Sequence, residues 1–458
     1  MSPSAGTDYQ IAARIERLPL SIWHLKILVP IGTGWFFDAF DALSIAYVLP
    51  VLSGLWNLKQ ADIGELIAVG YVGQVIGSIL FGWLAERIGR VPCTIYTLIL
   101  FSVMSFACAF AWDPRSLEAM RFVQGIGLGG EIPIMASYIG EFAASKRRGR
   151  FALGYQMLFT IGLLFAGLAG VFVVPNLGWQ WMFIIGALPA VIALPLRWLL
   201  PESPRWLASR GRSEEADKIL SKIEFEISKG GKRPLPPIPT DVPPVKPAET
   251  HFSELLKGIY LRRSLTVWAI WFCSYSVIYG LSTWIPSIFR TVYHVSVQQS
   301  VNIGFTNSVV GVIGALIAVA SIDLVGRRPL FVAGQLLSAV PLLILAFSQN
   351  LDVGTVQILV TASFFFITWL AISLSTYTAE LYPTEMRALG CGVGNAWLRA
   401  ASVLGPYMVG LILGTGGGIN IVFLMFGGFA LVGGLVTLAF AVETRGRVLE
   451  ELSPSGSK

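Results

Sequence analysis

Charged residues are scarce in this sequence of 458 residues. Asp, Glu, Lys and Arg make up 13% of it, whereas an ordinary soluble domain carries about 25% charged residues. A soluble protein of this size could not cover its surface with so few polar side chains. Hydrophobic residues make up 54%, and this excludes a disordered chain, because disordered chains are rich in charge and poor in apolar residues. The composition indicates an integral membrane protein.

Cysteine and histidine are also rare. The cysteines lie in or beside apolar runs without a CxxC pair, and the histidines are scattered: Cys93, Cys108, Cys273 and Cys391, with His24, His251 and His294. We therefore expect neither disulfides nor a metal site. The sequence has no cofactor motif and no nucleophile elbow, so we expect no cofactor and no enzymatic activity. The net charge of +6 does not indicate nucleic acid as a partner, because no basic segment is interleaved with aromatic residues.

Long apolar runs are abundant. A bilayer core about 30 Å thick needs about 20 apolar residues per helix, and we count twelve such runs. We expect an all-α membrane protein with transmembrane helices at approximately 27–54, 63–85, 92–112, 116–143, 151–174, 180–200, 264–289, 298–321, 329–348, 354–381, 389–413 and 420–442. The predicted order is an N-terminal segment (1–26), a six-helix bundle (27–200), a linker (201–263), a second six-helix bundle (264–442) and a tail (443–458).

The linker has two parts of different character. Residues 213–227 have the pattern of an amphipathic helix, and the stretch from Pro234 to Pro247 carries seven prolines. This second part has the composition of an extended spacer.

Loop charges predict the orientation of the chain in the membrane. Twelve spans place both termini on one side, and the loops on that side hold Arg14, Arg17, Lys26, Arg87, Arg90, Lys146, Arg147, Arg148, Arg150, Arg327, Arg328, Arg387, Arg445 and Arg447. The opposite loops hold only Lys59, Arg115 and Arg290. Because cytoplasmic loops are enriched in Lys and Arg, we expect both termini and the linker to be cytoplasmic, in the plasma membrane (the inner membrane of a bacterial cell).

The two halves of the chain repeat each other. Charged motifs after the second and eighth spans, at the ends of the fourth and tenth, and after the sixth and twelfth correspond as Glu86 with Asp323, Glu141 with Glu380, and Glu202 with Glu443. Their separations of 237, 239 and 241 residues are nearly constant. This regularity predicts two parallel six-helix halves.

The repeated motifs resemble those of the major facilitator superfamily, and the resemblance covers nearly the whole chain. Residues 82–90 (GWLAERIGR) are similar to its loop motif, with Glu86 where Asp is usual. Residues 201–205 (PESPR) and 443–447 (ETRGR) look like marks of its sugar-porter and organic-ion branches. The resemblance implies two pseudo-symmetric bundles, alternating access, a cavity lined by the first, fourth, seventh and tenth helices, and a monomer.

Other motifs are closest to transporters of small metabolites. Residues 121–131 and 141–150 resemble niacin-transporter-like and synaptic-vesicle-protein-like members, and residues 38–41 (DAFD) resemble the DGxD motif of aromatic-acid:proton symporters. The seventh span lacks the Gln-rich pattern of sugar porters, and the fifth lacks the Gly-Pro motif of drug:proton antiporters.

Ionisable residues inside the spans are the main functional candidates, because a charge at the helix centre costs at least about 2.5–3.5 kcal/mol. They are Asp38 and Asp41 in the first span, Arg121 and Glu131 in the fourth, and Arg399 in the eleventh. A rise of about 1.5 Å per residue brings Asp41 to the depth of Arg121, and Asp38 to that of Arg399. Glu131 and Gln156 form a candidate polar site.

Asp41 and Arg121 match an Asp–Arg pair in proton-coupled sugar porters. If the two separate in a low-dielectric cavity, the carboxylate takes up a proton. We therefore expect a proton switch, with Asp38 beside it; the alternative is a permanent salt bridge.

Arg399 matches the position of an arginine in organic-anion transporters, and a guanidinium suits a carboxylate. We expect it to bind an anionic substrate together with Asn395 and Asp38; the alternative is that Asp38 neutralises it and it binds nothing. Six aromatic residues complete the predicted pocket, unless they only pack against lipid or neighbouring helices: Tyr275, Tyr279, Trp284, Phe365, Trp369 and Tyr377.

Charged residues at the cytoplasmic helix ends are expected to form ion pairs that close an inner gate, the alternative being solvated flanking charges. They are Glu86, Arg90, Glu141, Arg150, Glu202, Arg205, Asp323, Arg327, Glu380, Arg387 and Glu443. Residues 125–130 (GIGLGG) match GxGxxG, but no strand precedes them, so close helix packing, or a path for a moving helix, is the better explanation.

Together these features predict proton-coupled uptake of a small organic anion, most simply an aromatic or heteroaromatic carboxylate such as nicotinate or a benzoate, with the proton as coupling ion. The alternatives are a sugar, polyol or other neutral-solute porter, an exporter, and a non-transporting membrane sensor or scaffold.

Overall fold

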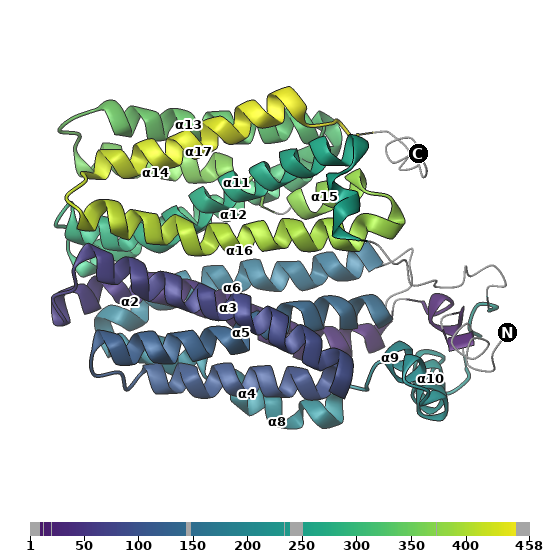
Figure 1. The fold of residues 1–458 in the computed structure, drawn as a ribbon. Helices are drawn as coiled ribbons and strands as arrows, with labels where there is room; N and C mark the ends of the chain where they lie inside the picture. The colour runs from purple at the N-terminus through teal and green to yellow at the C-terminus, as the bar shows by residue number, and fades with distance from the viewer. Residues whose placement is uncertain are drawn as a thin grey trace. The chain divides into compact units, whose positions relative to one another are not determined.

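The computed structural model describes residues 10–11, 13–19, 21–142, 148–232, 234–238, 251–371 and 373–445, and these residues contain helices and no strand. The N-terminal part comprises α2 (Ile22–Leu55), α3 (Gln60–Ile88), α4 (Arg90–Cys108), α5 (Pro114–Phe142), α6 (Arg148–Leu177), α7 (Gln180–Gly186), α8 (Pro189–Leu199), α9 (Pro204–Ser209) and α10 (Ser213–Ile227). The C-terminal part comprises η1 (Phe252–Leu256), α11 (Gly258–Thr291), α12 (Val297–Val325), α13 (Arg327–Phe347), α14 (Val353–Ile367), α15 (Leu374–Leu381), α16 (Thr384–Gly414) and α17 (Ile419–Phe440) (Figure 1).

Nine helices in the described part of the chain are long and apolar enough to cross a membrane. The other three predicted spans correspond to α5, which carries Arg121 and Glu131, and to the pairs α7–α8 and α14–α15. The amphipathic helix predicted at 213–227 is confirmed as α10.

Two predicted spans are not continuous helices. The sixth, predicted at 180–200, is broken at residues 187–188, directly before Pro189, which begins α8. Proline fits the first turn of a helix, because its missing N–H would be unpaired there, but it cannot continue a helix that precedes it. The tenth, predicted at 354–381, is broken between Ile367 and Leu374. Here the Thr368 hydroxyl donates to the Phe365 carbonyl at 2.8 Å.

Some predicted features lie outside the described residues. They are Lys146 and Arg147, the part of the linker at 239–250, and the tail from residue 446 onward with Arg447; the side chains of Arg148, Arg150 and Gln156 are likewise not described.

Glycines bring α3 and α5 into backbone contact. A methyl group added at Gly77 would lie 2.0 Å from the Ile126 carbonyl oxygen, and one at Gly129 would lie 2.0 Å from the Gln74 carbonyl oxygen. Gly127, on the same stretch of α5, faces Phe101 of α4, where an added methyl group would lie 2.8 Å from the Phe101 backbone nitrogen. This confirms that the glycine-rich run 125–130 serves helix packing, where only glycine leaves room for the neighbouring backbone.

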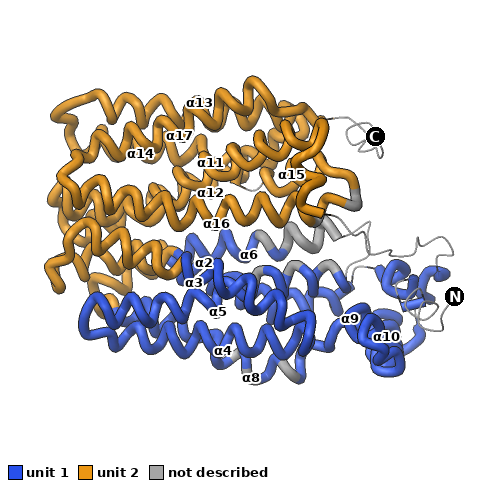
Figure 2. The backbone as a smooth tube through the Cα atoms, viewed as in Figure 1, with its two compact units in different colours: residues 1–42, 72–166, 180–247 blue, residues 43–71, 167–179, 248–458 orange. Residues whose placement is uncertain are grey.

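The chain divides into two compact units (Figure 2). Unit 1 contains residues 1–42, 72–166 and 180–247, and unit 2 contains 43–71, 167–179 and 248–458. The units differ from the predicted bundles, because 43–71 and 167–179 group with the C-terminal helices. The predicted division at 27–200 and 264–442 stays a prediction.

Within unit 2, the start of α3 packs closely against α16 and α11. A methyl group at Gly410 would lie 2.7 Å from the Gly64 Cα, and the Gln60 side chain donates to the Thr291 hydroxyl at 3.0 Å. The loop charges predict that these helix ends lie on the outer side of the membrane.

Candidate functional site

Asp41, Arg121 and Gln124 form a buried cluster between α2 and α5. Arg121 Nη1 donates to Asp41 Oδ2 at 2.8 Å and to Gln124 Oε1 at 2.9 Å, and Gln124 Nε2 donates to Asp41 Oδ1 at 2.6 Å. Both carboxylate oxygens therefore have a donor. Asp41 is 1% exposed and Arg121 is 4% exposed. The predicted contact between Asp41 and Arg121 is present, whereas its role in proton coupling stays a prediction.

Gln124 is a member of this cluster that the sequence analysis missed. It carries no charge, so a search for ionisable residues in the spans passes over it. Its spacing was the available signal, because residues three apart on a helix share a face. A glutamine that both donates to the carboxylate and accepts from the guanidinium fixes the geometry of the pair.

Two further carboxyl groups lie in the same unit. Asp38 is buried on α2, and Glu131 is buried on α5, where it interacts electrostatically with Asp38. The two oxygens of Glu131 have no hydrogen-bond partner among the described residues. The predicted partner of Glu131, Gln156, cannot be compared, since its side chain is not described.

Arg399 and Asn395 lie on α16, four residues apart on one face. Arg399 is half-buried, with its carbonyl accepting from the Ser402 hydroxyl at 2.9 Å, and Asn395 is exposed. Because Asp38 belongs to unit 1 and Arg399 to unit 2, their pairing stays a prediction, as does the anion site.

Four of the predicted pocket aromatics gather near the break between α14 and α15. Tyr275 of α11 donates its hydroxyl to the Ala371 carbonyl at 2.8 Å, inside the break, and its ring lies 6.0 Å from that of Tyr279. Phe365 and Trp369 are half-buried, with ring centroids 5.8 Å apart. The indole N–H of Trp369 has no partner within the described ranges. Discontinuous membrane helices often border transport sites, and this break is a signal that the sequence analysis missed.

Two neighbouring aromatics were also missed. Trp271 stacks on Tyr275 with ring centroids 5.1 Å apart, and Tyr71 of α3 packs edge-on against Tyr279 at 5.3 Å. Both lie in unit 2 with the residues that they contact. They extend the aromatic group from α11 to α3.

Trp284 and Tyr377 have packing environments. Trp284 is fully buried and donates its indole N–H to the Pro406 carbonyl at 2.9 Å, which ties α11 to α16. Tyr377 is buried against Phe331 and donates its hydroxyl to the Val442 carbonyl at 2.9 Å. These contacts account for both residues without a substrate, although their predicted role in the pocket is not tested by them.

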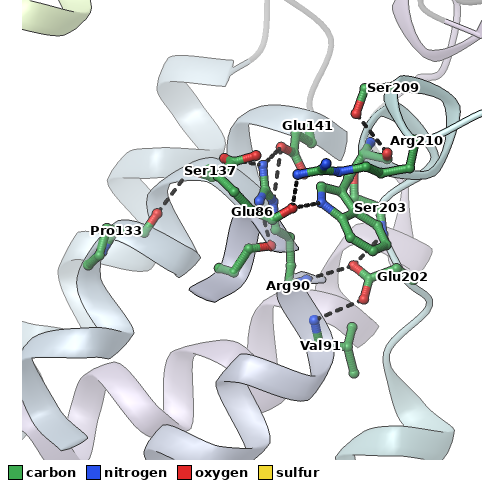
Figure 3. Close-up of polar contacts among 12 residues, drawn as sticks. Glu86, Arg90, Val91, Pro133, Ser137, Glu141, Glu202, Ser203, Ser209 and Arg210 are labelled. Atoms are coloured by element: carbon green, nitrogen blue, oxygen red, sulfur yellow. Dashed lines mark hydrogen bonds and ion pairs between the residues drawn. The ribbon is translucent and has the colours of Figure 1, made fainter. Parts of the chain in front are cut away.

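The charges at the ends of α3, α4 and α5 form the predicted ion pairs (Figure 3). Arg90 Nη2 lies 2.9 Å from both Glu86 Oε1 and Glu141 Oε1. Glu202 accepts from the backbone N–H groups of Arg90 at 3.0 Å and Val91 at 3.2 Å, at the beginning of α4. A carboxylate is favoured there, because the first N–H groups of a helix have no partner within the helix.

The same arrangement recurs in unit 2. Arg327 lies 2.7 Å from Asp323 and 3.2 Å from Glu380. Glu443 accepts from the backbone N–H groups of Arg327 at 3.1 Å and Arg328 at 3.0 Å, at the beginning of α13. The predicted correspondence of the two halves is thus matched contact for contact, whereas the gate function stays a prediction.

The two matching glutamates differ in acidity. Burial raises the pKa of Glu202 above its usual 4.5, although the N–H groups of Ser203, Arg90 and Val91 oppose the rise. Burial would also raise the pKa of Glu443, but the N–H groups of Arg445, Arg327, Arg328 and Thr444 together lower it. Glu443 has one more N–H donor than Glu202 and is less buried, and these two differences explain why its pKa is lowered while that of Glu202 is raised.

The other predicted gate residues make different contacts. Arg205 lies 3.4 Å from Glu16 in the N-terminal segment, and Arg387 donates to the Ala379 carbonyl at 3.0 Å. Arg150 cannot be placed, since its side chain is not described.

A cavity of about 330 Å³ lies in unit 2 at the ends of α2, α3 and α11. It is lined by Ser53, Gly54, Leu58, Gln60, Arg290, Thr291 and His294. None of the predicted substrate-binding residues is among them. Across the described ranges, no group of three or more His, Cys, Asp or Glu side chains is arranged to hold a metal ion.

Comparison with known proteins relates this arrangement to a transporter family. The family model described as "Sugar (and other) transporter" matches residues 29–455. The niacin transporter NiaP of Acinetobacter baylyi is 32% identical over 447 residues, which are 96% of this chain and 99% of that protein. The gallate transporter of Pseudomonas putida is 26% identical over 445 residues, 96% of each chain.

Solved structures agree on the fold. The xylose transporter XylE of E. coli, in a partially occluded inward-open conformation, matches with a TM-score of 0.70 at 20% identity, over 93% of this chain and 100% of that chain. The intramembrane charge pair and the duplicated carboxylate contacts therefore lie in a known fold. The chain belongs to the sugar (and other) transporter family of the major facilitator superfamily, and it is a multi-pass transporter of the cell membrane, not an enzyme.

Proposed function

We propose that the protein takes up a small organic anion together with protons by alternating access, and that the anion is an aromatic or heteroaromatic carboxylate of the size of nicotinate or a benzoate. The observation that carries the proposal is the buried Asp41–Arg121–Gln124 cluster. A carboxylate held by an arginine in a low-dielectric site stays ionised, and it takes up a proton when the arginine moves away. A buried carboxylate of this kind can thus convert a proton gradient into movement of helices.

Arg399 supports an anionic substrate. It is a half-buried arginine within a membrane-spanning helix, and a guanidinium forms two parallel hydrogen bonds with a carboxylate. Aromatic side chains near the α14–α15 break supply flat surfaces on which a ring can stack. The names of two relatives, a niacin transporter and a gallate transporter, point to substrates of this class.

A neutral-solute porter is the second candidate. It is favoured by the xylose symporters among the structures with the same fold. The two candidates differ in what they require of Arg399, because a sugar has no carboxylate for the guanidinium to bind.

Uptake by purified full-length protein in liposomes tests the proposal. With an alkaline interior, we expect nicotinate, benzoate or 3,4,5-trihydroxybenzoate to accumulate above its outside concentration, and xylose to be excluded. Arg399→Ala should reduce carboxylate uptake at least about tenfold, which is the loss of one hydrogen-bonded charge interaction of about 1.5–3 kcal/mol. Asn420→Ala, which removes a polar side chain of α17 that donates to the Ala346 and Ser348 carbonyls, is the control. Xylose uptake, or full carboxylate uptake by the Arg399 variant, would contradict the anion proposal.

A further inference from the structure

Glu131 is a buried carboxyl group with unusual surroundings. It lies on α5, ten residues after Arg121, and is 1% exposed. Neither carboxyl oxygen has a hydrogen-bond partner among the described residues. Asp41, equally buried in the same unit, has a donor on each oxygen. Two buried carboxyl groups in one unit thus have opposite surroundings.

The backbone of α2 is in direct contact with the Glu131 carboxyl group. A methyl group added at Gly34 would lie 2.0 Å from Glu131 Oε1, so any other residue at position 34 would displace the acid. Gly34 and Asp38 are one helical turn apart and share a face of α2. Asp38 is therefore near Glu131, and it is the charged residue that acts on it electrostatically.

Two more polar groups adjoin this position. Tyr155 of α6 interacts electrostatically with both Glu131 and Asp38, and its ring stacks on that of Trp35 with centroids 5.1 Å apart. The Tyr155 hydroxyl and the Trp35 indole N–H are buried and have no partner within the described ranges. Asp38 from α2 and Tyr155 from α6 are the described titratable groups that face Glu131.

Ionisation of Glu131 at this buried position would cost free energy. An ion taken from water into a protein interior costs several kcal/mol unless a partner compensates it, and no described residue donates to Glu131. Asp38 adds repulsion, because two nearby carboxyl groups do not both ionise readily. A neutral carboxylic acid avoids both costs, so a proton belongs at this site.

We propose that Glu131, with Asp38, is a second proton-carrying site of the transporter, separate from Asp41. The proton is held by the two carboxyl groups while Gly34 packs against Glu131, and it is exchanged when the transport cycle admits water to them. Tyr155 and Trp35 are positioning residues beside the acid. The inference rests on the proposed proton coupling, and it adds a second proton to each substrate carried.

The first experiment measures the proton directly and needs no substrate. Infrared spectra of the full-length protein in liposomes report the C=O band of a protonated carboxyl group. We expect such a band at neutral pH in the wild type and its loss in Glu131→Gln. Glu224→Gln is the matched control, because arginines lower the pKa of Glu224 and it should contribute no such band. An unchanged band in Glu131→Gln would overturn the proposal.

A second variant covers the case in which Glu131→Gln does not fold. Tyr155→Phe keeps the acid and removes only the neighbouring hydroxyl, so the C=O band should shift in frequency. A band that neither shifts in Tyr155→Phe nor depends on pH in the wild type would also overturn the assignment.

The third measurement is the ratio of protons to nicotinate, found as the nicotinate gradient that just balances a fixed pH gradient. We expect two protons in the wild type and one in Glu131→Gln. A merely structural role would slow uptake without changing this ratio. If the wild type shows no coupling to protons, the proposed function fails; if it is coupled and the ratio is the same in both proteins, only the second site fails.

Discussion

The Asp41 carboxylate and the Arg121 guanidinium lie 2.8 Å apart between α2 and α5, almost completely removed from solvent. Removing one partner of such a pair leaves an unpaired buried charge and costs roughly 3–5 kcal/mol. Separating them during transport faces a similar cost, and a proton on Asp41 reduces it by neutralising the carboxylate. The contact therefore suits a residue that takes up a proton as the arginine moves away.

The first prediction concerns this pair. Asp41→Asn should abolish accumulation driven by a pH gradient, because Asn cannot carry a proton, while exchange of internal for external substrate persists. Uptake and counterflow in liposomes measure the two activities. The double variant Asp41→Asn with Arg121→Gln removes both charges and controls for the unpaired arginine. Accumulation at the wild-type level in Asp41→Asn would show that coupling lies elsewhere.

A second prediction uses the matching glutamates at the starts of α4 and α13. Glu443 has a lowered pKa, so its contribution to stability is present above pH 4.5 and is lost as the pH falls through its folded-state pKa. Glu202 has a raised pKa, so its contribution is greatest below pH 4.5 and declines as the pH rises through its folded-state pKa. Glu443→Gln should therefore lower the Tm more than Glu202→Gln at pH 7.

Thermal unfolding of both variants at pH 7 and at a pH below 4.5, near the folded-state pKa of Glu443, checks this difference. The loss caused by Glu443→Gln should shrink in acid, whereas that caused by Glu202→Gln should not. Equal losses at both pH values would mean that the two sites hold their helices in the same way.

A third prediction concerns the N-terminal segment. Arg14 Nη2 and Arg17 Nη2 lie 2.7 Å and 2.6 Å from the Glu224 carboxylate of α10. Burial alone would raise the pKa of Glu224, but the bonds from both arginines lower it. Docking of the segment should therefore hold above pH 4.5 and weaken as the pH falls through the folded-state pKa.

Hydrogen exchange of residues 10–17 follows this docking. Glu224→Gln should speed exchange about tenfold at pH 7, since hydrogen bonds to charged groups contribute about 1.5–3 kcal/mol. Glu214→Gln, an exposed substitution on α10, is the control. Identical exchange in wild type and Glu224→Gln would place the attachment of the segment elsewhere.

The fourth prediction tests the close contact of α3 and α16. Gly410→Leu would force a side chain into the Gly64 backbone, and overpacking of this kind costs about 1–3 kcal/mol. We expect folded protein with much reduced uptake, because the helix ends cannot approach. Gly428→Leu is the matched control, since a side chain there meets nothing within 4 Å. Normal uptake in Gly410→Leu would mean that transport does not require this contact.

Contacts between charged residues could be predicted from the sequence more fully than the breaks in helices or the packing of side chains. The Asp41–Arg121 contact follows from depth in the membrane, because charge is rare there and helix rise is regular. The ion pairs of Arg90 and Arg327 follow from the internal repeat. The interruption near Ala371 does not, since the apolar run continues across it, and hydrophobicity carries no information about backbone direction.

The direction in which a side chain points is the second feature that the sequence does not predict. Trp284 and Tyr275 are both aromatic and lie on the same predicted helix. Trp284 is buried and donates to the Pro406 carbonyl, whereas Tyr275 donates to the Ala371 carbonyl in the α14–α15 break. Gln124 was missed because it is neutral. The contact between Gly34 and Glu131 joins α2 and α5, and a single sequence does not pair positions on different helices.

The bond between the Tyr275 hydroxyl and the Ala371 carbonyl links the shape of one helix to the position of another. The Ala371 carbonyl, inside the break, accepts a hydrogen bond from a side chain of α11, and in a membrane such a group cannot turn to lipid instead. If α11 rotated and carried the hydroxyl away, the carbonyl would need a new donor, and rewinding of the helix would supply one. We therefore expect bending of the tenth span and rotation of the seventh to be coupled through this hydrogen bond.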